Sequence, residues 1–436
     1  MPPAPTIASR TASGMMIVSS ARRLCAAEGH FVGRAGGPAS GRRKRPFLHD
    51  VRQRRGQECP RHGKAKAGPH RPRVEYAPRR SCKCRRRGVP MGSYRSLILG
   101  CGGRSGAHAE VYPELEGMEL VAACDLDAER LEAFTTRWGI ERGFEDYETA
   151  LAEVQPDIVH VVTQPSNRVW EAETAAKAGV KAAIIEKPIA IMPSEIEELQ
   201  RIRDLSKMKI IVNCQRRYFP QFRDGTIRRV MNEEIGDVYL IRASTRGNLM
   251  SMGPHTMDLL LQLMDDVKPE AVWAMAWGVD ETGYKAHHRA PEHTFAEYWF
   301  PGGVRVMFDC DTEALGTPGE ESFWMHLHFD ILGTRGRIYV TQNAGWWYQA
   351  EGMADPVHGE SSWDDQQRNG QRDFTQAVAD WLDGGEPHLN RFETARATFD
   401  ALTGALQSVY EGRRVTFPHS FTDEMWNEQR GGLKSS

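Results

Sequence analysis

Residues 96–106 read Ser-Leu-Ile-Leu-Gly-Cys-Gly-Gly-Arg-Ser-Gly, an apolar stretch that runs directly into a glycine-rich turn. The apolar part, residues 96–100, predicts a short buried strand. Glycines after such a strand permit a tight turn and let backbone N–H groups approach a pyrophosphate at the start of the next helix. The spacing is G-x-G-x-x-x-G, with Ser105 where the stricter dinucleotide motif has its third glycine. We therefore expect dinucleotide binding by Gly100, Gly102, Gly103, Arg104, Ser105 and Gly106.

An acidic residue ends the next predicted strand. Residues 119–125 read Glu-Leu-Val-Ala-Ala-Cys-Asp, and Asp125 lies 25 positions after Gly100. Dinucleotide sites place an acid roughly 20 residues after the turn, at the end of the second strand, where it holds the ribose hydroxyls. A carboxylate there repels a 2′-phosphate, so the sequence predicts NAD as cofactor and disfavours NADP. The alternative interpretation is a surface aspartate that starts a turn.

Predicted strands and helices alternate as far as residue 214. Apolar and amphipathic patterns predict strands over 157–163, 182–185 and 209–214, and helices over 128–138, 147–154, 167–178 and 193–208. This alternation predicts an α/β fold, a doubly wound parallel sheet with helices on both faces. Ligands of such sheets bind at the carboxyl ends of the strands. Those ends are Gly100, Asp125, Thr163 and the pair Glu186-Lys187.

The pattern changes after residue 216. Extended segments with few helices between them are predicted over 238–246, 271–277, 294–300, 304–311, 323–332 and 337–341, and helices over 371–382 and 392–410. Such a run of strands favours a largely antiparallel sheet with one open face. We therefore expect a Rossmann domain over 93–215, an α+β domain with an open-faced sheet over 216–418, and a tail over 419–436.

The first 92 residues differ in composition from the rest. They hold 22 Lys and Arg against 4 Asp and Glu, whereas the remaining residues hold 34 and 54. The segment is rich in Arg, Pro and Gly, and it shows no sustained apolar period, so we expect it to be disordered. A basic arm of this kind could bind nucleic acid through phosphates. Alternatively it is not native coding sequence, because Met91 directly precedes the first strand.

The cysteines and the apolar runs exclude some classes of protein. Cys59, His62, Cys82 and Cys84 have no regular ligand spacing, so we predict no metal site. The other four cysteines follow no disulfide pattern, as expected for a cytoplasmic protein. No apolar run approaches the roughly 18 residues that span a bilayer, so we expect no membrane segment.

A charged pair follows another predicted buried strand, in Ile184-Ile185-Glu186-Lys187-Pro188. A lysine at this place reaches the crevice beside a bound nicotinamide. If burial or a neighbouring cation lowers its pKa, it can exchange a proton with a substrate hydroxyl. Taken alone, Lys187 is better explained as a surface lysine in an ion pair.

With the glycine-rich turn, Glu186-Lys187-Pro188 resembles the glucose–fructose oxidoreductase/inositol dehydrogenase (Gfo/Idh/MocA) family. Other segments from about residue 94 to about 418 support this resemblance. They are Thr163-x-Pro165, Asn213-Cys214-Gln215-Arg216-Arg217-Tyr218-Phe219-Pro220, Gly253-Pro254-His255-Thr256-Met257-Asp258 and Gly333-Thr334-Arg335-Gly336-Arg337.

The resemblance implies roles for particular residues. Lys187 is expected to be catalytic with His255 as its partner, and the Lys187–Pro188 bond is expected to be cis. Many relatives carry Asp four residues before that histidine, whereas this chain has Ser251. Further expected contacts are to the cofactor from Thr163, Glu186 and Lys187, and to the substrate from Lys187, His255, Asp258 and Arg217.

Two alternatives stay open at these positions. Asp258 either orients the imidazole three residues before it or is a helix N-terminal acid stabilised by the helix dipole. Arg216 and Arg217 either contact cofactor or substrate, or brace the junction between the domains.

We therefore predict an NAD-dependent oxidoreductase that transfers hydride between nicotinamide and a hydroxyl-bearing carbon of a sugar, polyol or sugar derivative. Its partners would be that small molecule and a second copy of the chain, bound through the open sheet face. For the folded part we expect neither nucleic acid nor membrane as a partner. The alternatives are an NAD-dependent enzyme that cleaves glycosides or epimerises without net redox change, and a nonenzymatic NAD(H)-binding regulator.

Overall fold

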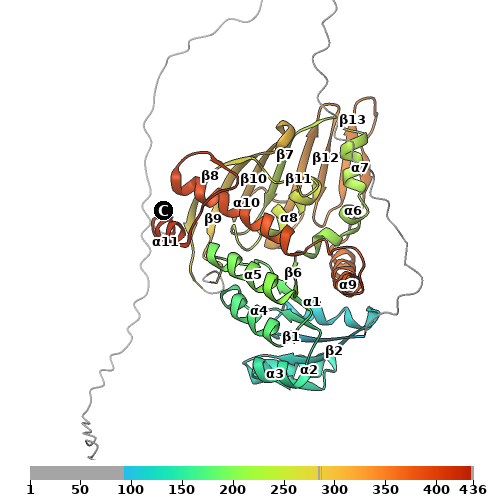
Figure 1. Ribbon diagram of the computed structural model, residues 1–436. Helices are drawn as coiled ribbons and strands as arrows, with labels where there is room; N and C mark the ends of the chain where they lie inside the picture. The colour runs from blue at the N-terminus through green and yellow to red at the C-terminus, as the bar shows by residue number, and fades with distance from the viewer. Residues whose placement is uncertain (1–92, 283–284, 286, 434–436) are drawn as a thin grey trace, which may run out of the picture. The chain divides into compact units, whose positions relative to one another are not determined.

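The computed structural model describes residues 93–282, 285 and 287–433 (Figure 1). The expectations for residues 1–92, namely disorder, a start at Met91 and the absence of a zinc site at Cys59, His62, Cys82 and Cys84, lie outside the described residues.

The first sheet has the strand order of a dinucleotide-binding fold. Its strands are β1 (Tyr94–Leu99), β2 (Met118–Cys124), β3 (Arg142–Phe144), β4 (Ile158–Val161), β5 (Ala182–Glu186) and β6 (Lys209–Asn213). They are ordered β3-β2-β1-β4-β5-β6, and every paired neighbour is parallel. The order reverses between β1 and β4, which places a ligand crevice at the carboxyl ends of these two strands. The predicted doubly wound sheet is confirmed, and β3 is an additional short strand.

The helices of this part are α1 (Ser105–Ala109), α2 (Ala128–Trp138), α3 (Tyr147–Val154), α4 (Arg168–Lys177) and α5 (Pro193–Ser206). Two of them, α2 and α3, begin at capping residues visible in the sequence. The Asp127 carboxylate accepts a hydrogen bond from the Arg130 N–H at the start of α2, and Gly139 ends that helix with φ of 66°. Asp146 caps α3 in the same way.

The second sheet has nine strands. They are β7 (Val238–Thr245), β8 (Ala271–Val279), β9 (Pro291–Trp299), β10 (Arg305–Asp311), β11 (Leu327–Gly333), β12 (Gly336–Thr341), β13 (Trp346–Ala350), β14 (Val357–Gly359) and β15 (Val415–Thr416). Their order is β14-β13-β12-β11-β7-β10-β9-β8-β15. Only the β7–β10 pair is parallel among these described strands, which confirms the largely antiparallel prediction.

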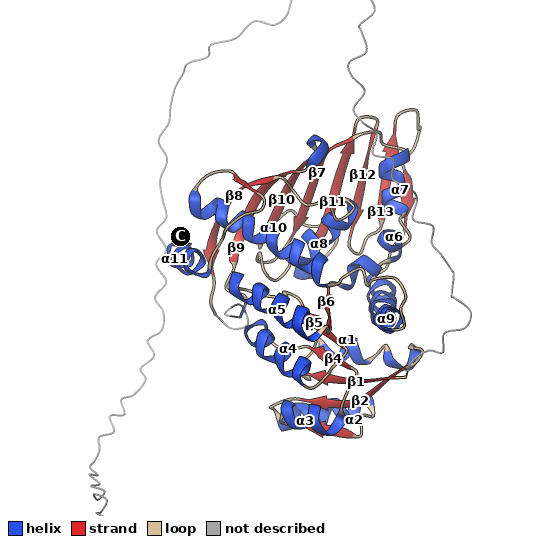
Figure 2. Ribbon diagram, viewed as in Figure 1, coloured by secondary structure: helices blue, strands red, loops and turns tan. Residues whose placement is uncertain are grey.

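One face of this sheet is packed and the other is open. In β10, Val306, Phe308 and Cys310 are fully buried, and the residues between them are more exposed. α8 (Gly253–Leu263) and α10 (Phe392–Glu411) lie across the packed face (Figure 2). On the open face, Trp273, Trp277 and Met275 of β8 are 39%, 39% and 47% exposed. The alternation along the strands therefore produces the predicted two-sided sheet.

Four further helices were not fully predicted. They are α6 (Pro220–Arg223), α7 (Thr226–Glu233), α9 (Trp363–Leu382) and α11 (Asp423–Leu433). α9 begins eight residues before the predicted 371–382, and it packs against the turn Gln215–Tyr218 that follows β6. A Cβ at Gly370 would lie 2.8 Å from the Phe219 ring, so glycine permits this close approach. α11 lies in the segment expected to be a tail and buries Trp426.

Candidate active site

The glycine-rich turn between β1 and α1 has the shape that a pyrophosphate requires. Gly100 has φ of 90°, and a Cβ there would meet the Val162 carbonyl oxygen at 2.6 Å. Cβ atoms at Gly102 and Gly103 would meet no described atom within 4 Å, so the outer side of the turn is open. The Ser105 hydroxyl donates to the Gly102 carbonyl and closes the turn. The predicted turn residues therefore come together in an arrangement that fits a bound dinucleotide.

Asp125 lies beside this turn at the end of β2. Its carboxylate accepts hydrogen bonds from the backbone N–H groups of Cys101 at 2.7 Å and Asp127 at 2.9 Å. The Arg130 guanidinium pairs with it at 2.9 and 3.0 Å. Burial raises the pKa of Asp125, but the hydrogen bonds from Arg130, Asp127 and Cys101 outweigh burial and lower that pKa. The carboxylate is therefore ionised, in the place where the ribose hydroxyls are expected.

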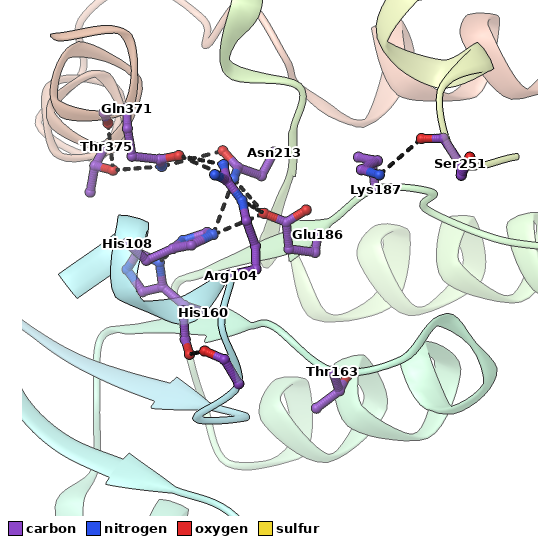
Figure 3. Close-up of polar contacts among 12 residues, drawn as sticks. Arg104, His108, His160, Thr163, Glu186, Lys187, Asn213, Ser251, Gln371 and Thr375 are labelled. Atoms are coloured by element: carbon purple, nitrogen blue, oxygen red, sulfur yellow. Dashed lines mark hydrogen bonds and ion pairs between the residues drawn. The ribbon is translucent and has the colours of Figure 1, made fainter. Parts of the chain in front are cut away.

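Glu186 is the centre of a buried polar network (Figure 3). Its Oε1 accepts from Asn213 Nδ2 at 2.6 Å and Arg104 Nε at 2.8 Å, and it lies 3.0 Å from His108 Nε2. Burial raises the pKa of Glu186, whereas Arg104 and His108 bring it well below its usual value. The predicted cofactor residues Arg104 and Glu186 are thus held to each other, which fixes the turn against the end of β5.

Residues far apart in the sequence complete this network. Gln371 of α9 accepts from Arg104 Nη2 at 3.0 Å and exchanges longer hydrogen bonds with Asn213. On the other side, Nδ1 of His108 lies 2.9 Å from Nδ1 of His160. Nε2 of His160 lies 2.6 Å from the Tyr112 hydroxyl. None of these partners was predicted, because no local motif connects them.

Arg168 braces the crevice from α4 and was also not predicted. It is 2% exposed, and its guanidinium donates to the backbone carbonyl of Glu186 and, at 3.3 Å, to that of Thr163. The Thr163 hydroxyl donates to the Glu171 carboxylate at 2.7 Å. Arg168 therefore joins the ends of β4 and β5, where the predicted cofactor residues Thr163 and Glu186 lie.

Lys187 directs its ammonium toward the second sheet. Nζ donates to the backbone carbonyl of Ser251 at 2.9 Å (Figure 3), and the Lys187–Pro188 bond is cis, as predicted. Burial and, to a smaller extent, the cation of Arg216 lower the pKa of Lys187 to about 8 against the opposing effect of Glu186. The Ser251 hydroxyl itself donates to the Asn248 carbonyl at 3.2 Å. The serine therefore holds the lysine through its backbone and adds no charge.

His255 lies in the first turn of α8 and is 7% exposed. Burial lowers its pKa well below the usual value, and the cations of Arg216 and Lys187 lower it further. Nδ1 is buried and has no hydrogen-bond partner among the described residues. The structure thus brings a neutral imidazole with an unused nitrogen into the electrostatic range of Lys187.

Arg217 and Asp258 are joined to each other. Arg217 Nε lies 2.8 Å from the Asp258 carboxylate, and Nη1 lies 2.7 Å from that of Asp266. Asn390 donates to the second oxygen of Asp258 at 3.0 Å. Arg217 is 1% exposed, so this pair braces the turn after β6 against α8. The predicted substrate contacts of Arg217 and Asp258 stay a prediction, and the described partners of Asp258 are Arg217 and Asn390.

The sheet order, the open turn and the buried lysine define a nicotinamide-dependent oxidoreductase with a Rossmann domain and an open-faced second sheet. The chain belongs to the Gfo/Idh/MocA oxidoreductase family. The family profile described as "Oxidoreductase family, NAD-binding Rossmann fold" matches residues 94–214, and that of the family's C-terminal domain matches residues 235–339. Together these matches cover more than half of the chain, and NAD is the cofactor that they imply.

Individual relatives have dehydrogenase names. D-apiose dehydrogenase of Paraburkholderia graminis is 30% identical over 191 residues, which is 40% of this chain and 50% of the relative. The chain spans about half the length of the curated relatives it matches. Among solved structures, an Agrobacterium radiobacter oxidoreductase in complex with NAD+, L-tartaric acid and magnesium has a TM-score of 0.63 and 20% identity, covering 74% of this chain and 98% of that one. Levoglucosan dehydrogenase in complex with NADH and levoglucosan has a TM-score of 0.63 and 16% identity, covering 75% and 100%.

The described residues contain neither a candidate membrane-spanning helix nor a candidate metal-binding cluster. No described helix combines the length and apolar character needed to cross a membrane. The His, Cys, Asp and Glu side chains of that part of the chain form no group of three or more arranged for a metal ion.

Proposed function

We propose that this protein is an NAD-dependent dehydrogenase that oxidises a CH–OH group of a sugar, polyol or sugar derivative. The observation that carries the proposal is Lys187, a partly buried amine with a pKa of about 8 beside a neutral His255. A group with a pKa near the working pH is suited to general acid–base catalysis. The names of the relatives, D-apiose dehydrogenase and levoglucosan dehydrogenase, support a carbohydrate substrate.

A bound NAD would supply the acceptor for the hydride of the carbinol carbon. The Lys187 amine takes the hydroxyl proton in its neutral form and returns a proton to the carbonyl oxygen in the reverse direction. The Ser251 carbonyl fixes the direction of Nζ through a single hydrogen bond. His255 binds a substrate hydroxyl through Nδ1, because that nitrogen has no other described partner.

The cofactor is held by residues at the strand ends. The backbone of the turn binds the pyrophosphate, and the ionised Asp125 binds the ribose hydroxyls. Thr163 and the β5 end lie at the same edge of the sheet, where the nicotinamide end of the cofactor is expected. The turn is formed by Gly100, Gly102, Gly103, Arg104, Ser105 and Gly106.

The test is to add NAD+ and a panel of sugars and polyols to the purified chain, and to follow NADH absorbance together with product analysis. We expect net NADH formation with at least one compound and a carbonyl product. A converted substrate without net NADH would replace this proposal by the glycoside-cleaving or epimerising alternative. Tight NAD binding without turnover of any compound would indicate a regulator.

We further propose that the chain forms a homo-oligomer through the open face of its second sheet, and that it is located in the cytoplasm. The exposed Trp273, Met275 and Trp277 form an apolar strip on the open sheet face, which suits contact with a second copy of the chain. Sedimentation at several concentrations tests this, and a strictly monomeric protein contradicts it.

The four described cysteines are free and buried, which supports a cytoplasmic location.

A further inference from the structure

Among the described residues, Arg216 is a buried cation without a carboxylate partner. It lies in the turn after β6 and is 3% exposed. Its Nε and Nη1 have no hydrogen-bond partner within the described part of the chain, and no described carboxylate forms an ion pair with it. Burial lowers the pKa of Arg216 to about 9. The next residue, Arg217, is equally buried and has two carboxylate partners.

This contrast requires a physical explanation. A buried ion without a partner is costly, so folded proteins pair such groups or reserve them for a ligand. Arg217 is paired with carboxylates and stabilises the fold. Arg216 has no such partner among the described residues, and its guanidinium keeps its charge at neutral pH even with a pKa of about 9. A ligand is therefore the partner that Arg216 lacks.

Arg216 belongs to the candidate active site, because its turn directly follows the end of β6, where Asn213 pairs with Glu186 of β5, the residue before Lys187. Its charge lowers the pKa of Lys187, and it is the strongest charge acting on His255. His255 Nδ1 is a second buried polar atom there without a described partner. The proposed base, the free imidazole nitrogen and the free guanidinium therefore act on one region. Oxidised NAD brings a further positive charge on its nicotinamide ring, so the region favours a substrate with negative charge.

Two tryptophans border the same region. The Arg216 guanidinium carbon lies 6.0 Å from the centroid of the Trp363 ring. Trp324, from the segment between β10 and β11, meets Trp363 edge to face at 5.0 Å and is 45% exposed. Aromatic rings of this kind pack against the apolar C–H face of a sugar ring. The surroundings of Arg216 thus combine a cation with an aromatic wall.

We propose that Arg216 binds a carboxylate of the substrate, and that the substrate is a sugar acid or a related polyhydroxy acid. This inference rests on the proposed dehydrogenase function. The fork of a guanidinium matches the two oxygens of a carboxylate. In the reaction the C–H bond of the carbinol breaks and its hydride passes to NAD+. The hydroxyl proton passes to Lys187, and a keto acid and NADH result. The carboxylate itself is unchanged.

The first measurement is binding to the full chain saturated with NAD+, by calorimetry. The ligands are D-gluconate and D-glucuronate, each compared with D-glucose, and D-glucose 6-phosphate as an anion of another kind. We expect the carboxylates to bind more tightly than glucose. Arg216→Gln should weaken carboxylate binding by roughly 10- to 100-fold, the range for a lost charged hydrogen bond, with Arg216→Lys in between. Arg201→Gln, which removes an exposed arginine of α5, should change nothing.

NAD affinity and the melting curve are also measured for each variant. They separate a loss of acid binding from a loss of cofactor binding or of folding. If Arg216→Gln weakens NAD as much as the acids, Arg216 is a cofactor residue and the proposal is overturned. It is equally overturned if glucose 6-phosphate alone binds through Arg216, or if no carboxylate binds at millimolar concentration. Should Arg216→Gln not fold, the Arg216→Lys variant and the ligand comparison on the unmodified chain still decide the question.

The second measurement is NADH formation with the same compounds. A higher kcat/KM for the acids, lost through KM in Arg216→Gln, supports the proposal. Oxidation of glucose without oxidation or binding of the acids leaves the dehydrogenase function intact and rejects the acid site. Binding of acids through Arg216 without NADH from any compound supports the acid site and rejects the dehydrogenase function.

Discussion

The ammonium of Lys187 donates a hydrogen bond to the backbone carbonyl of Ser251 at 2.9 Å. Many relatives that the sequence resembles have an aspartate at that position. Here the lysine keeps a fixed direction but gains no carboxylate from position 251, and its pKa falls to about 8 because burial outweighs the opposing effect of Glu186. This relationship determines how the chain should respond to substitution at either residue.

Removing the lysine should remove most of the chemistry. Lys187→Ala should lower kcat by about 10²–10⁴-fold, the usual contribution of a general acid–base group. NAD affinity should change little, because the turn and Asp125 are intact. Lys177→Ala on the exposed side of α4 is the matched control. Near-normal turnover in Lys187→Ala, on a substrate found by the screen, would end the proposed mechanism.

The pKa of Lys187 predicts a pH dependence with a definite sign. Oxidation requires the neutral amine, so kcat for oxidation should rise with pH and level off above about 8. Reduction requires the ammonium and should fall over the same range. His255 adds no second step above neutral pH, because its pKa lies well below the usual value. Profiles in both directions check this, and parallel profiles would contradict the assignment.

A carboxylate at position 251 should move that profile. In Ser251→Asp an opposite charge beside the ammonium favours the charged form, so the rising limb should shift upward by about one pH unit or more. Ser251→Asn has a similar size without the charge and should leave the limb in place. Retained or raised turnover in Ser251→Asp would mean that the site only lacks a third polar group. A strong loss without a pH shift would indicate a different reaction.

Arg130, the ion-pair partner of Asp125, should also influence the preference for NAD over NADP. Asp125→Ala should weaken NAD and narrow its preference over NADP, because the ribose hydroxyls lose their acceptor. The substitution also frees the Arg130 guanidinium, which pairs with Asp125 at 2.9 Å and is half exposed. NADP affinity should therefore rise, and the double variant Asp125→Ala/Arg130→Ala should lose that gain. Titration by fluorescence measures both cofactors, and tighter NADP binding by the unmodified chain would refute the assignment of Asp125.

The predictable part of the fold is the part with local signals. The turn at Gly100, the caps Asp127 and Gly139, and the alternation of strands and helices are all visible within short stretches. β3 was missed because a strand of three partly exposed residues has no apolar period. The early start of α9 was missed because Trp363 is followed by seven residues without an apolar side chain, residues 364–370.

The site was predictable only in its motif residues. Lys187 and His255 follow from a resemblance, whereas the partners of Glu186 come from three distant segments. Asn213 and Gln371 are 158 positions apart and meet only through packing of α9 against the turn after β6. The Ser251 contact uses a backbone carbonyl, which leaves no trace in a side-chain pattern. Long-range pairing of this kind is set by tertiary packing.

The pair Arg217–Asp258 separates a structural role from a substrate role. Asp258→Asn removes one of the two carboxylates that pair with the buried Arg217, so it should lower the free energy of unfolding by roughly 1.5–3 kcal/mol, the range for a hydrogen bond to a charged group. An exposed pair such as Arg201–Glu198 is screened by solvent and contributes little, so Glu198→Gln is the control. Arg217→Met combined with Asp258→Leu should recover part of the loss, because neither charge then remains buried alone. Urea unfolding of the unmodified chain, Arg217→Met, Asp258→Leu and the double variant gives the coupling energy of the pair. If Asp258→Asn instead keeps its stability and raises KM for the substrate, then Asp258 contacts substrate, as the family resemblance implies.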